Sequence, residues 1–196
     1  MKRLLVVLCI VLAVLCLGLH IGYRRAQIAK LDMLKDEQVP YEALFRELAP
    51  TLGWDWQTLA AVAWEESHFN PHARSHAGAC GVMQLMPQTA GKFGLNDSTV
   101  WVAEDNIRAG AEYIRFLQHK WSFISNPDEQ LKFVLASYNA GPGVVFSARR
   151  QVREQNEGNP YLWSHVEQYV ESIHPKQYVH KVMRTAERLR KEERDE

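Results

Sequence analysis

Cysteine is scarce in this sequence, and its distribution excludes two kinds of site. The 196 residues include three cysteines, and two of them, Cys9 and Cys16, lie in an apolar N-terminal run. The rest of the chain therefore has one thiol, Cys80, which can form neither an intramolecular disulfide nor a cysteine-rich metal site. We expect Cys80 to be a small buried apolar residue with no role of its own.

An excess of basic residues is also lacking. Lys and Arg together number 23, as do Asp and Glu. Residues 1–25 carry four of the basic residues and no acidic one, so residues 26–196 have 19 basic against 23 acidic side chains, a formal charge of −4. A nucleic-acid-binding protein would present a basic surface. The composition therefore argues against a nucleic-acid partner.

The first 23 residues have the composition of a membrane segment. Residues 4–19 are apolar apart from Gly18, with Lys2 and Arg3 before them and two arginines shortly after them. Extended to residue 23, the segment has about the 20 residues that a spanning helix needs. No small-x-small cleavage pattern follows, so we expect a transmembrane signal-anchor over 1–23 rather than a cleaved signal peptide. The charges favour an N-terminus inside the cytoplasmic membrane and a body outside it.

Alternation with a period of two, the pattern of strands, is absent from the body of the chain. After a juxtamembrane spacer over 24–40, the pattern is helical throughout. Asparagine before proline at 126–127 and 159–160 marks two helix starts. The expected helices cover 41–49, 55–68, 85–93, 104–120, 127–139, 143–155, 160–171 and 175–192. The sequence thus predicts a mainly α domain over 41–190, with 191–196 as a frayed charged tail.

Two adjacent glutamates end one expected helix, and helical periodicity separates them. Glu66 follows Leu59 and Val62 by seven and four positions, so it continues the apolar face. Glu65 points about 100° away, toward a more polar side, and is expected to be a surface charge. A half-buried carboxyl has a raised pKa and can donate a proton near neutral pH. An ion pair between Glu66 and a base such as Arg74 is the structural alternative.

Two other kinds of catalytic site have little support. Ser67 and His68 are adjacent, but no Gly-x-Ser-x-Gly nucleophile motif is present. His68, His72 and His76 recur every fourth residue, as metal ligands on one helix face would. Pro71 interrupts that helix, however, and no third-ligand motif accompanies the row. We therefore expect neither a nucleophilic triad nor a bound metal.

Three further polar side chains near these glutamates have more than one possible role. Tyr138 ends an expected helix, directly before a Gly-Pro-Gly turn. Its hydroxyl could lie at the rim of a packed ring, or it could hold Glu66 or a substrate amide. Ser67 and Ser75 could bind the Glu66 carboxyl or cap local turns. The sequence leaves these alternatives open.

Four motifs, in this order, resemble those of the lytic murein transglycosylases with a soluble-lytic-transglycosylase (SLT) domain. They are Glu66-Ser67-x-Phe69-Asn70-Pro71-x-Ala73-x-Ser75, Gly78-Ala79-x-Gly81-x-Met83-Gln84-Leu85-Met86-Pro87-x-Thr89-Ala90, Asn106-Ile107-x-Ala109-Gly110-x-x-Tyr113 and Tyr138-Asn139-Ala140-Gly141-Pro142-Gly143. The resemblance covers about 41–185, and the 41–85 stretch is most similar to the catalytic domains of the membrane-bound lytic murein transglycosylases F. It implies a lysozyme-like helical fold of the goose type, with no cofactor.

The resemblance also implies a reaction. Glu66 would protonate the glycosidic oxygen between N-acetylmuramic acid (MurNAc) and N-acetylglucosamine (GlcNAc). The same residue, now a base, would take the proton of the C6 hydroxyl, which closes a 1,6-anhydro ring. The 2-acetamido group would replace the second carboxylate that a retaining hydrolase needs, and the sequence offers no obvious candidate for that second carboxylate.

Seven residues would bind the substrate on this resemblance. Those expected to line the glycan groove, to lie beside Glu66 or to close the groove are Ser75, Met83, Gln84, Met86, Tyr138, Asn139 and Tyr178. The segment 171–178 is shorter than the corresponding segment of many relatives and lacks their Glu-Thr-Arg motif. This departure from the family pattern concerns the role expected of Tyr178.

The expected protein is a monomeric lytic transglycosylase of the cell inner membrane. It would cross the membrane once and act on peptidoglycan strands in the periplasm. Two other readings stay open, a hydrolytic muramidase of the goose-lysozyme type and a non-catalytic peptidoglycan-binding module of an envelope assembly.

Overall fold

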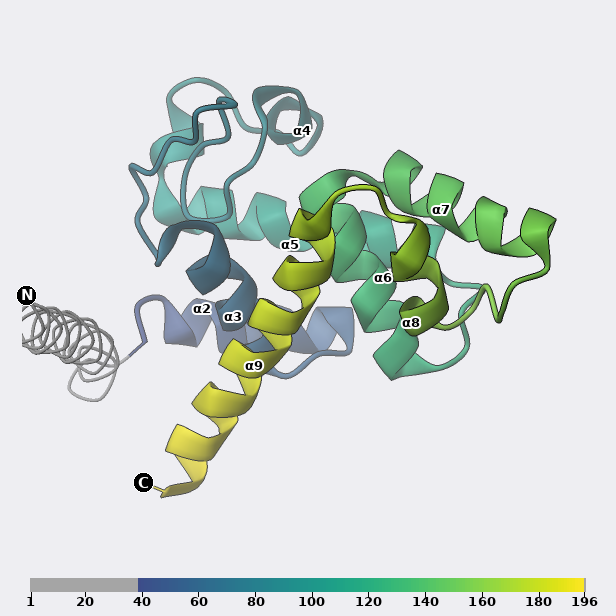
Figure 1. Cartoon of the computed structure of the whole chain (residues 1–196). Coiled ribbons are helices and arrows are strands. Elements are labelled where there is room, and N and C mark those ends of the chain that lie inside the picture. Colours follow the sequence, from purple (N-terminus) through teal and green to yellow (C-terminus); the bar gives the residue numbers. More distant parts are fainter. Residues whose placement is uncertain (1–38, 196) are drawn as a thin grey trace, which may run out of the picture. The chain divides into compact units, whose positions relative to one another are not determined.

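The computed structural model describes residues 39–195, and helices make up most of that part of the chain (Figure 1). Its elements are α2 (Glu42–Leu48), the 3-10 helix η1 (Ala49–Leu52), α3 (Trp56–Ser67), α4 (Pro87–Lys92), η2 (Thr99–Trp101), α5 (Ala103–Lys120), α6 (Pro127–Ala140), α7 (Pro142–Gln155), α8 (Trp163–Val166), η3 (Glu167–Tyr169) and α9 (Ile173–Asp195). Between residues 39 and 195 the only β pairing consists of isolated bridges at Cys80. The predicted mainly α class is confirmed.

The predicted membrane segment over 1–23 lies outside the described residues, as does nearly all of the spacer over 24–40. Among the helices from residue 39 onward, none combines the length and the apolar composition that crossing a membrane requires.

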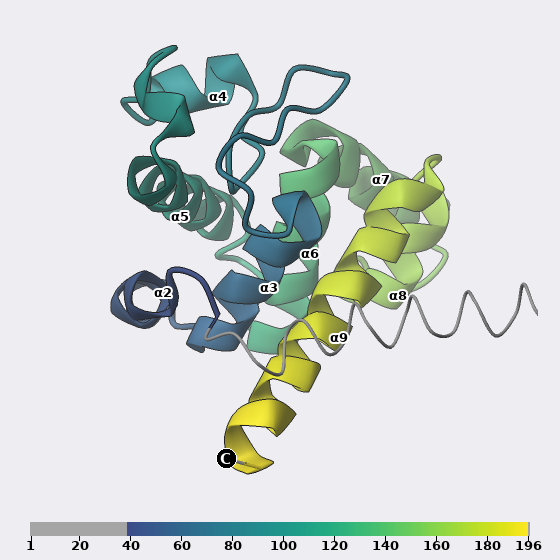
Figure 2. The same cartoon turned by 90° about the vertical axis from the view of Figure 1, so that its left-hand side faces the viewer.

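Helix α3 is the centre of the fold. Asp55 caps its start by accepting a hydrogen bond from the backbone N–H of Thr58 at 2.8 Å. Every residue from Gln57 to Ala63 is buried, so the helix is covered on all sides over two turns. It packs against α2 and α9, and Figure 2 shows it between them. Burial of its leucine and valine side chains contributes about 1.5–3 kcal/mol each.

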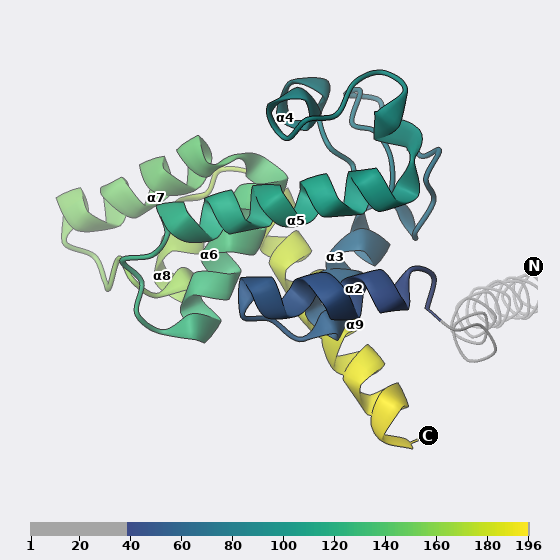
Figure 3. The ribbon, with the colours of Figure 1, turned by 180° about the vertical axis from the view of Figure 1, so that it is seen from behind.

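A second packing centre lies where α5, α6 and α7 meet. Figure 3, the view from behind, shows α5 running across the near side of the molecule, and its contacts reach both α2 and α6. The fully buried Trp121 follows α5 directly and stacks on Phe146 of α7 at 4.1 Å between ring centroids. Its indole Nε1 donates a hydrogen bond to the Ser137 hydroxyl of α6 at 2.8 Å. One aromatic side chain thus joins three helices.

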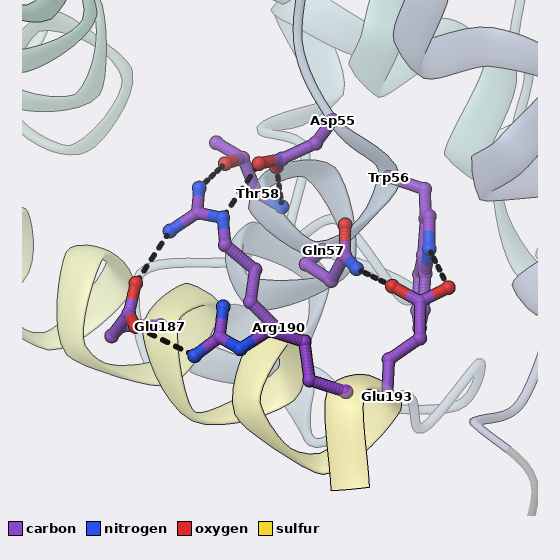
Figure 4. A network of polar contacts seen from close by, with 8 residues as sticks. Asp55, Trp56, Gln57, Thr58, Glu187, Arg190 and Glu193 are labelled. Atoms are coloured by element: carbon purple, nitrogen blue, oxygen red, sulfur yellow. Dashed lines mark hydrogen bonds and ion pairs between the residues drawn. The ribbon is translucent and has the colours of Figure 1, made fainter. Parts of the chain in front are cut away.

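Helix α9 runs antiparallel to α3, and a polar seam joins their ends (Figure 4). At the start of α3, Arg190 of α9 donates from Nε to Asp55 at 2.6 Å and from a terminal nitrogen to Thr58 Oγ1 at 2.7 Å. Because Asp55 also caps α3, the same carboxylate fixes the start of one helix and the register of the other.

The prediction of a frayed tail over 191–196 is wrong for the described part of that segment. Helix α9 continues to Asp195, and Glu193 accepts hydrogen bonds from Gln57, from Trp56 at 3.4 Å and from Arg46 at 2.5 Å. Trp56 and Gln57 form the first turn of α3, where the helix dipole favours a negative charge. These long-range contacts keep the last turns of α9 helical.

The helix predicted over 160–171 is interrupted, whereas the other predicted helices are found within a few residues of their expected ends. Asn159 does not cap a helix; its side chain accepts a hydrogen bond from the N–H of Tyr161 at 2.9 Å, two residues on. The carbonyl of Pro160 accepts from Arg149 at 3.0 Å. An Asx turn therefore replaces the first helical turn, and α8 starts only at Trp163.

Candidate active site

Glu66 lies in the last turn of α3, where the chain leaves the helix abruptly. The next residues, His68 and Phe69, have φ values of 53° and 62°, a left-handed conformation that ends a helix. The N–H of His68 still closes the helix on the carbonyl of Trp64 at 2.8 Å. Glu66 is therefore held by a rigid helix at the point where the loop over 68–86 begins.

The serines near Glu66 bind the backbone rather than the carboxyl. Ser67 is buried and donates to the carbonyl of Val82 at 2.7 Å, which ties the end of α3 to the loop. The hydroxyl of Ser75 accepts from the N–H of Ala79 at 2.9 Å. Of the two roles open from the sequence, Ser75 takes that of closing a local turn, whereas Ser67 binds the carbonyl of a residue fifteen positions later and takes neither.

The side chain that holds Glu66 comes from α9. The hydroxyl of Tyr178, a residue only 7% exposed, donates a hydrogen bond to Glu66 Oε1 at 2.6 Å. Within the described part of the chain, no ion pair joins Glu66 to Arg74. The structural alternative of a Glu66–Arg74 pair is therefore not what the fold forms.

Glu65 is not the free surface charge that helical phase predicted. Its Oε1 accepts a hydrogen bond from the hydroxyl of Thr185 at 2.7 Å, in the half-buried layer between α3 and α9. Tyr178 and Thr185 are seven residues apart, so they lie on the same face of α9. One helix thus offers one hydroxyl to each of two consecutive carboxylates. The spacing of seven between Tyr178 and Thr185 is the sequence signal from which this arrangement could have been predicted.

Burial sets the protonation of Glu66. It raises the pKa of this carboxyl from 4.5 to about 7, opposed by the hydrogen bond from Tyr178 and aided by the nearby charge of Glu65. At neutral pH the group is therefore populated in both its acid and its carboxylate form. A carboxyl with this pKa can donate a proton in one step and accept one in the next.

Tyr138 interacts with the charge of Glu66 and binds the loop over 68–86. Its hydroxyl donates to the carbonyl of Met83 at 2.7 Å, and its ring lies 5.3 Å from that of Tyr113 between centroids. Burial raises the pKa of Tyr138, and the charge of Glu66 raises it further, so the phenol stays neutral. The alternative of a direct hydrogen bond to Glu66 is not the one formed.

Asn106, a fully buried residue of α5, supports the same loop from beneath. Its Oδ1 accepts from the N–H of Met83 at 2.7 Å, and its Nδ2 donates to the carbonyls of Cys80 at 3.2 Å and Val100 at 2.9 Å. Gly81 has a φ of 79°, and a Cβ there would lie 2.4 Å from Asn106 Nδ2. The motifs containing Gly81 and Asn106 are therefore two halves of one loop support.

Replacing Asn106 by alanine is expected to destabilise the domain by about 2–4 kcal/mol. The substitution strands the buried N–H of Met83 and the carbonyl of Val100, each at a cost of about 1–3 kcal/mol before relaxation and water entry, whereas the carbonyl of Cys80 keeps its hydrogen bond from the N–H of Leu85. Chemical denaturation of the variant measures the loss. Asn139→Ala is the matched control, because that asparagine is exposed, and it should change stability by no more than about 0.5 kcal/mol. Equal stability of the two variants would contradict this role of Asn106.

Of the residues predicted to line the groove, Met83 has a fully buried side chain, whereas the others are at least partly exposed. Met83 is fully buried and packs against Gly110, so its side chain cannot contact a substrate in this conformation. Gln84 is half-buried and uses its amide to donate to the carbonyls of Ala73 and Gly81, both at 3.0 Å. Met86 is 44% exposed, Asn139 is exposed and Ser75 is half-buried. The buried position of Met83 shows that the expectation was wrong for this residue. Its burial could not be predicted, because this loop has no periodicity that indicates which side chains are buried.

No metal centre is found in the part of the chain that the structure describes. No three or more of its histidine, cysteine and acidic side chains lie in a group that could hold a metal ion. The row of His68, His72 and His76 does not lie on a helix, since α3 ends at Ser67.

Comparison with known proteins places the chain in a family. The model of the transglycosylase SLT domain matches residues 43–163. The chain belongs to the SLT-domain family. Membrane-bound lytic murein transglycosylases F from Desulfosudis oleivorans and from Yersinia pestis are 37% and 38% identical to this SLT-domain chain over 138 residues, which is 70% of it. That match covers 30% and 27% of those relatives, so the chain spans less than a third of their length.

A solved structure agrees with the SLT fold. The lytic transglycosylase Slt of Pseudomonas aeruginosa, in an inactive Glu-to-Gln mutant, superimposes with a TM-score of 0.61 at 27% identity. The superposition covers 75% of this SLT-domain chain and 23% of the other chain. The predicted lysozyme-like helical fold is therefore confirmed.

Proposed function

We propose that this SLT-domain chain is a lytic transglycosylase that cleaves the MurNAc-β-1,4-GlcNAc bond of peptidoglycan and leaves a 1,6-anhydroMurNAc end. The observation that carries the proposal is the state of Glu66, one carboxyl with a pKa of about 7, held at a helix end by Tyr178. The names of the relatives and the inactive Glu-to-Gln mutant of the Pseudomonas enzyme support it.

The reaction uses Glu66 twice. In its acid form Glu66 gives its proton to the glycosidic oxygen, the bond from C1 of MurNAc to that oxygen breaks, and GlcNAc leaves with its hydroxyl restored. The carbonyl oxygen of the 2-acetamido group stabilises the positive charge at C1. The Glu66 carboxylate then takes the proton of the C6 hydroxyl while the C6 oxygen bonds to C1. Glu66 ends protonated and no water is consumed.

The hydroxyl of Tyr178 stabilises the charged form of Glu66 during this reaction. A hydrogen bond to a carboxylate is stronger than one to a neutral carboxyl. Tyr178 therefore stabilises Glu66 in the interval between the two proton transfers, when the charge is buried. Ser75, Gln84, Met86, Tyr138 and Asn139 would hold the glycan, and Met83 would contribute through its backbone position only.

The remaining assignments extend the same proposal. The apolar segment over 1–23 would anchor the protein in the inner membrane as a single span, with the catalytic domain in the periplasm. The relatives from Desulfosudis oleivorans and Yersinia pestis are membrane-bound by name, which supports this location. The protein would act as a monomer on peptidoglycan strands, with no metal or cofactor.

Mass analysis of the fragments released from purified sacculi tests the proposal. We expect muropeptides with 1,6-anhydro ends. Fragments with ordinary reducing ends would instead identify a hydrolytic muramidase of the goose-lysozyme type. Binding to sacculi with no fragment released would identify a non-catalytic module.

Replacing Tyr178 by phenylalanine should move the alkaline limb of the pH–rate profile upward by about one pH unit. The hydrogen bond from Tyr178 lowers the pKa of Glu66, so its loss raises that pKa and keeps the acid form to higher pH; one unit corresponds to about 1.4 kcal/mol. The measurement is kcat against pH for both proteins. Tyr169→Phe serves as the control, because that exposed hydroxyl binds Glu157 instead. An alkaline limb that stays in place would contradict the role given to Tyr178.

A further inference from the structure

The outer side of α7 carries a cleft that the proposed chemistry does not use. It has a volume of about 450 Å³ and is lined by Gly143, Phe146, Ser147, Arg149, Arg150 and Arg153. Positions 143, 146, 150 and 153 follow the spacing of three and four that puts residues on one face of a helix. Three arginines line this cleft, and two of them, Arg150 and Arg153, lie on the helix face of Gly143 and Phe146.

Arg149 is fixed in place without a negative partner. Its guanidinium lies between two aromatic rings, 4.5 Å from the centroid of Phe123 and 4.9 Å from that of Tyr161. Its Nε donates to the carbonyl of Pro160 at 3.0 Å. Rings and a carbonyl orient the group but leave its charge uncompensated. Burial lowers the pKa of Arg149, and arginine side chains stay protonated in proteins.

The other two arginines are also poorly compensated. Arg150 has one carboxylate near it, that of Glu154 at 3.7 Å, and both side chains are about two-thirds exposed, at 69% and 65%. Such exposed pairs contribute little. Arg153 is exposed and forms no ion pair with any residue that the structure describes. A positive cleft thus stands on a chain whose residues 26–196 carry a formal charge of −4.

The first residue of the cleft follows Asn139, one of the predicted groove residues, closely along the chain. Asn139, at the end of α6, is four residues before Gly143, and the turn between them is closed by the N–H of Gly141 on the carbonyl of Ser137 at 2.9 Å. From that turn α7 runs outward to the edge of the domain (Figure 1). Gly143 and Arg153 are ten positions apart, which corresponds to about 15 Å along the helix.

We propose that this arginine cleft binds the acidic peptides that peptidoglycan carries on its muramoyl sugars. The inference rests on the proposed function, because the cleft would hold the peptide of a sugar bound near Glu66. An extended peptide of four to five residues spans about 13–18 Å, which matches the length of the cleft. Its side-chain and terminal carboxylates are groups that guanidinium binds through paired hydrogen bonds. Phe146 offers an apolar surface for the aliphatic parts.

The test compares two substrates with the full-length protein. Glycan strands that carry their peptides are compared with the same strands after an amidase has removed the peptides. For the double variant Arg150→Gln/Arg153→Gln we expect KM on peptide-bearing strands to rise about five- to tenfold, while kcat on those strands and KM on stripped strands stay unchanged. The matched control is Lys191→Gln/Arg194→Gln, which removes two exposed charges with the same spacing at the far end of α9.

Each outcome decides the proposal. A KM that stays unchanged on peptide-bearing strands, or that rises equally on both substrates, overturns it. Loss of binding to phosphatidylglycerol vesicles with unchanged KM would assign the cleft to a membrane surface instead. If the wild-type protein cleaves neither substrate, the proposed function fails independently, and titration with the isolated tetrapeptide then decides the cleft. Binding of the tetrapeptide by the wild type that is lost in Arg150→Gln/Arg153→Gln supports the inference. Absence of tetrapeptide binding by the wild type overturns it.

Discussion

Replacing Glu66 by glutamine should lower the rate of anhydromuropeptide release by at least about a thousandfold. General acid or base catalysis contributes about 10²–10⁴-fold, and the proposed mechanism assigns both steps to this one carboxyl. Glutamine has nearly the same shape, and its amide oxygen can still accept the hydrogen bond from Tyr178, so the fold should be retained. The measurement is kcat on purified sacculi, with circular dichroism to show that the variant is folded.

Glu65→Gln is the matched control for that experiment. It makes the same chemical change one position earlier in α3, on a carboxylate bound to Thr185 rather than to Tyr178. We expect the rate to fall by less than about tenfold, because Glu65 acts on the reaction only through its charge near Glu66. Comparable losses in the two variants would contradict the assignment of the chemistry to Glu66.

The helices and the raised pKa of Glu66 could be predicted because both depend on local periodicity. A stripe of apolar residues at spacings of three and four marks a helix and its buried face. Glu66 lies on that stripe, and the burial that raises its pKa follows from its position there. The surroundings of Glu65 were predicted wrongly, because periodicity within one helix does not show which other helix covers it. Its phase within α3 is polar, but α9, more than a hundred residues later in the chain, covers that side with Thr185.

Two other errors have the same physical origin. Met83 lies in a loop, where no period reports burial, and it is Gly110 on α5 that leaves room for its side chain. The end of α9 reads as a solvated charge run, yet Arg190 and Glu193 find their partners at the start of α3. Contacts between segments distant in sequence determine both the burial of Met83 and the helical end of α9. The composition of a single segment does not indicate such contacts.

Glu66→Gln should also change how stability depends on pH. In the folded protein burial raises the pKa of Glu66 from 4.5 to about 7, so between these values the folded state binds a proton that the unfolded state has released. The wild-type protein therefore loses stability as the pH rises through this window, by up to about 3 kcal/mol. Glutamine cannot ionise and avoids this loss. The variant should match the wild type near pH 4 and exceed it at pH 8 by about 2–3 kcal/mol.

Urea unfolding of both proteins at pH 4 and pH 8 measures this difference directly. Every other titrating group is shared by the two proteins, so the change in their stability difference between the two pH values isolates the ionisation of Glu66. A difference that is the same at both pH values would mean that the folded domain does not raise the pKa of Glu66. The half-buried carboxyl would then lack the property that allows it to act first as an acid and then as a base. A variant that is more stable but inactive at pH 8 would instead show that the domain gives up stability to keep a carboxyl in a site that disfavours its charge.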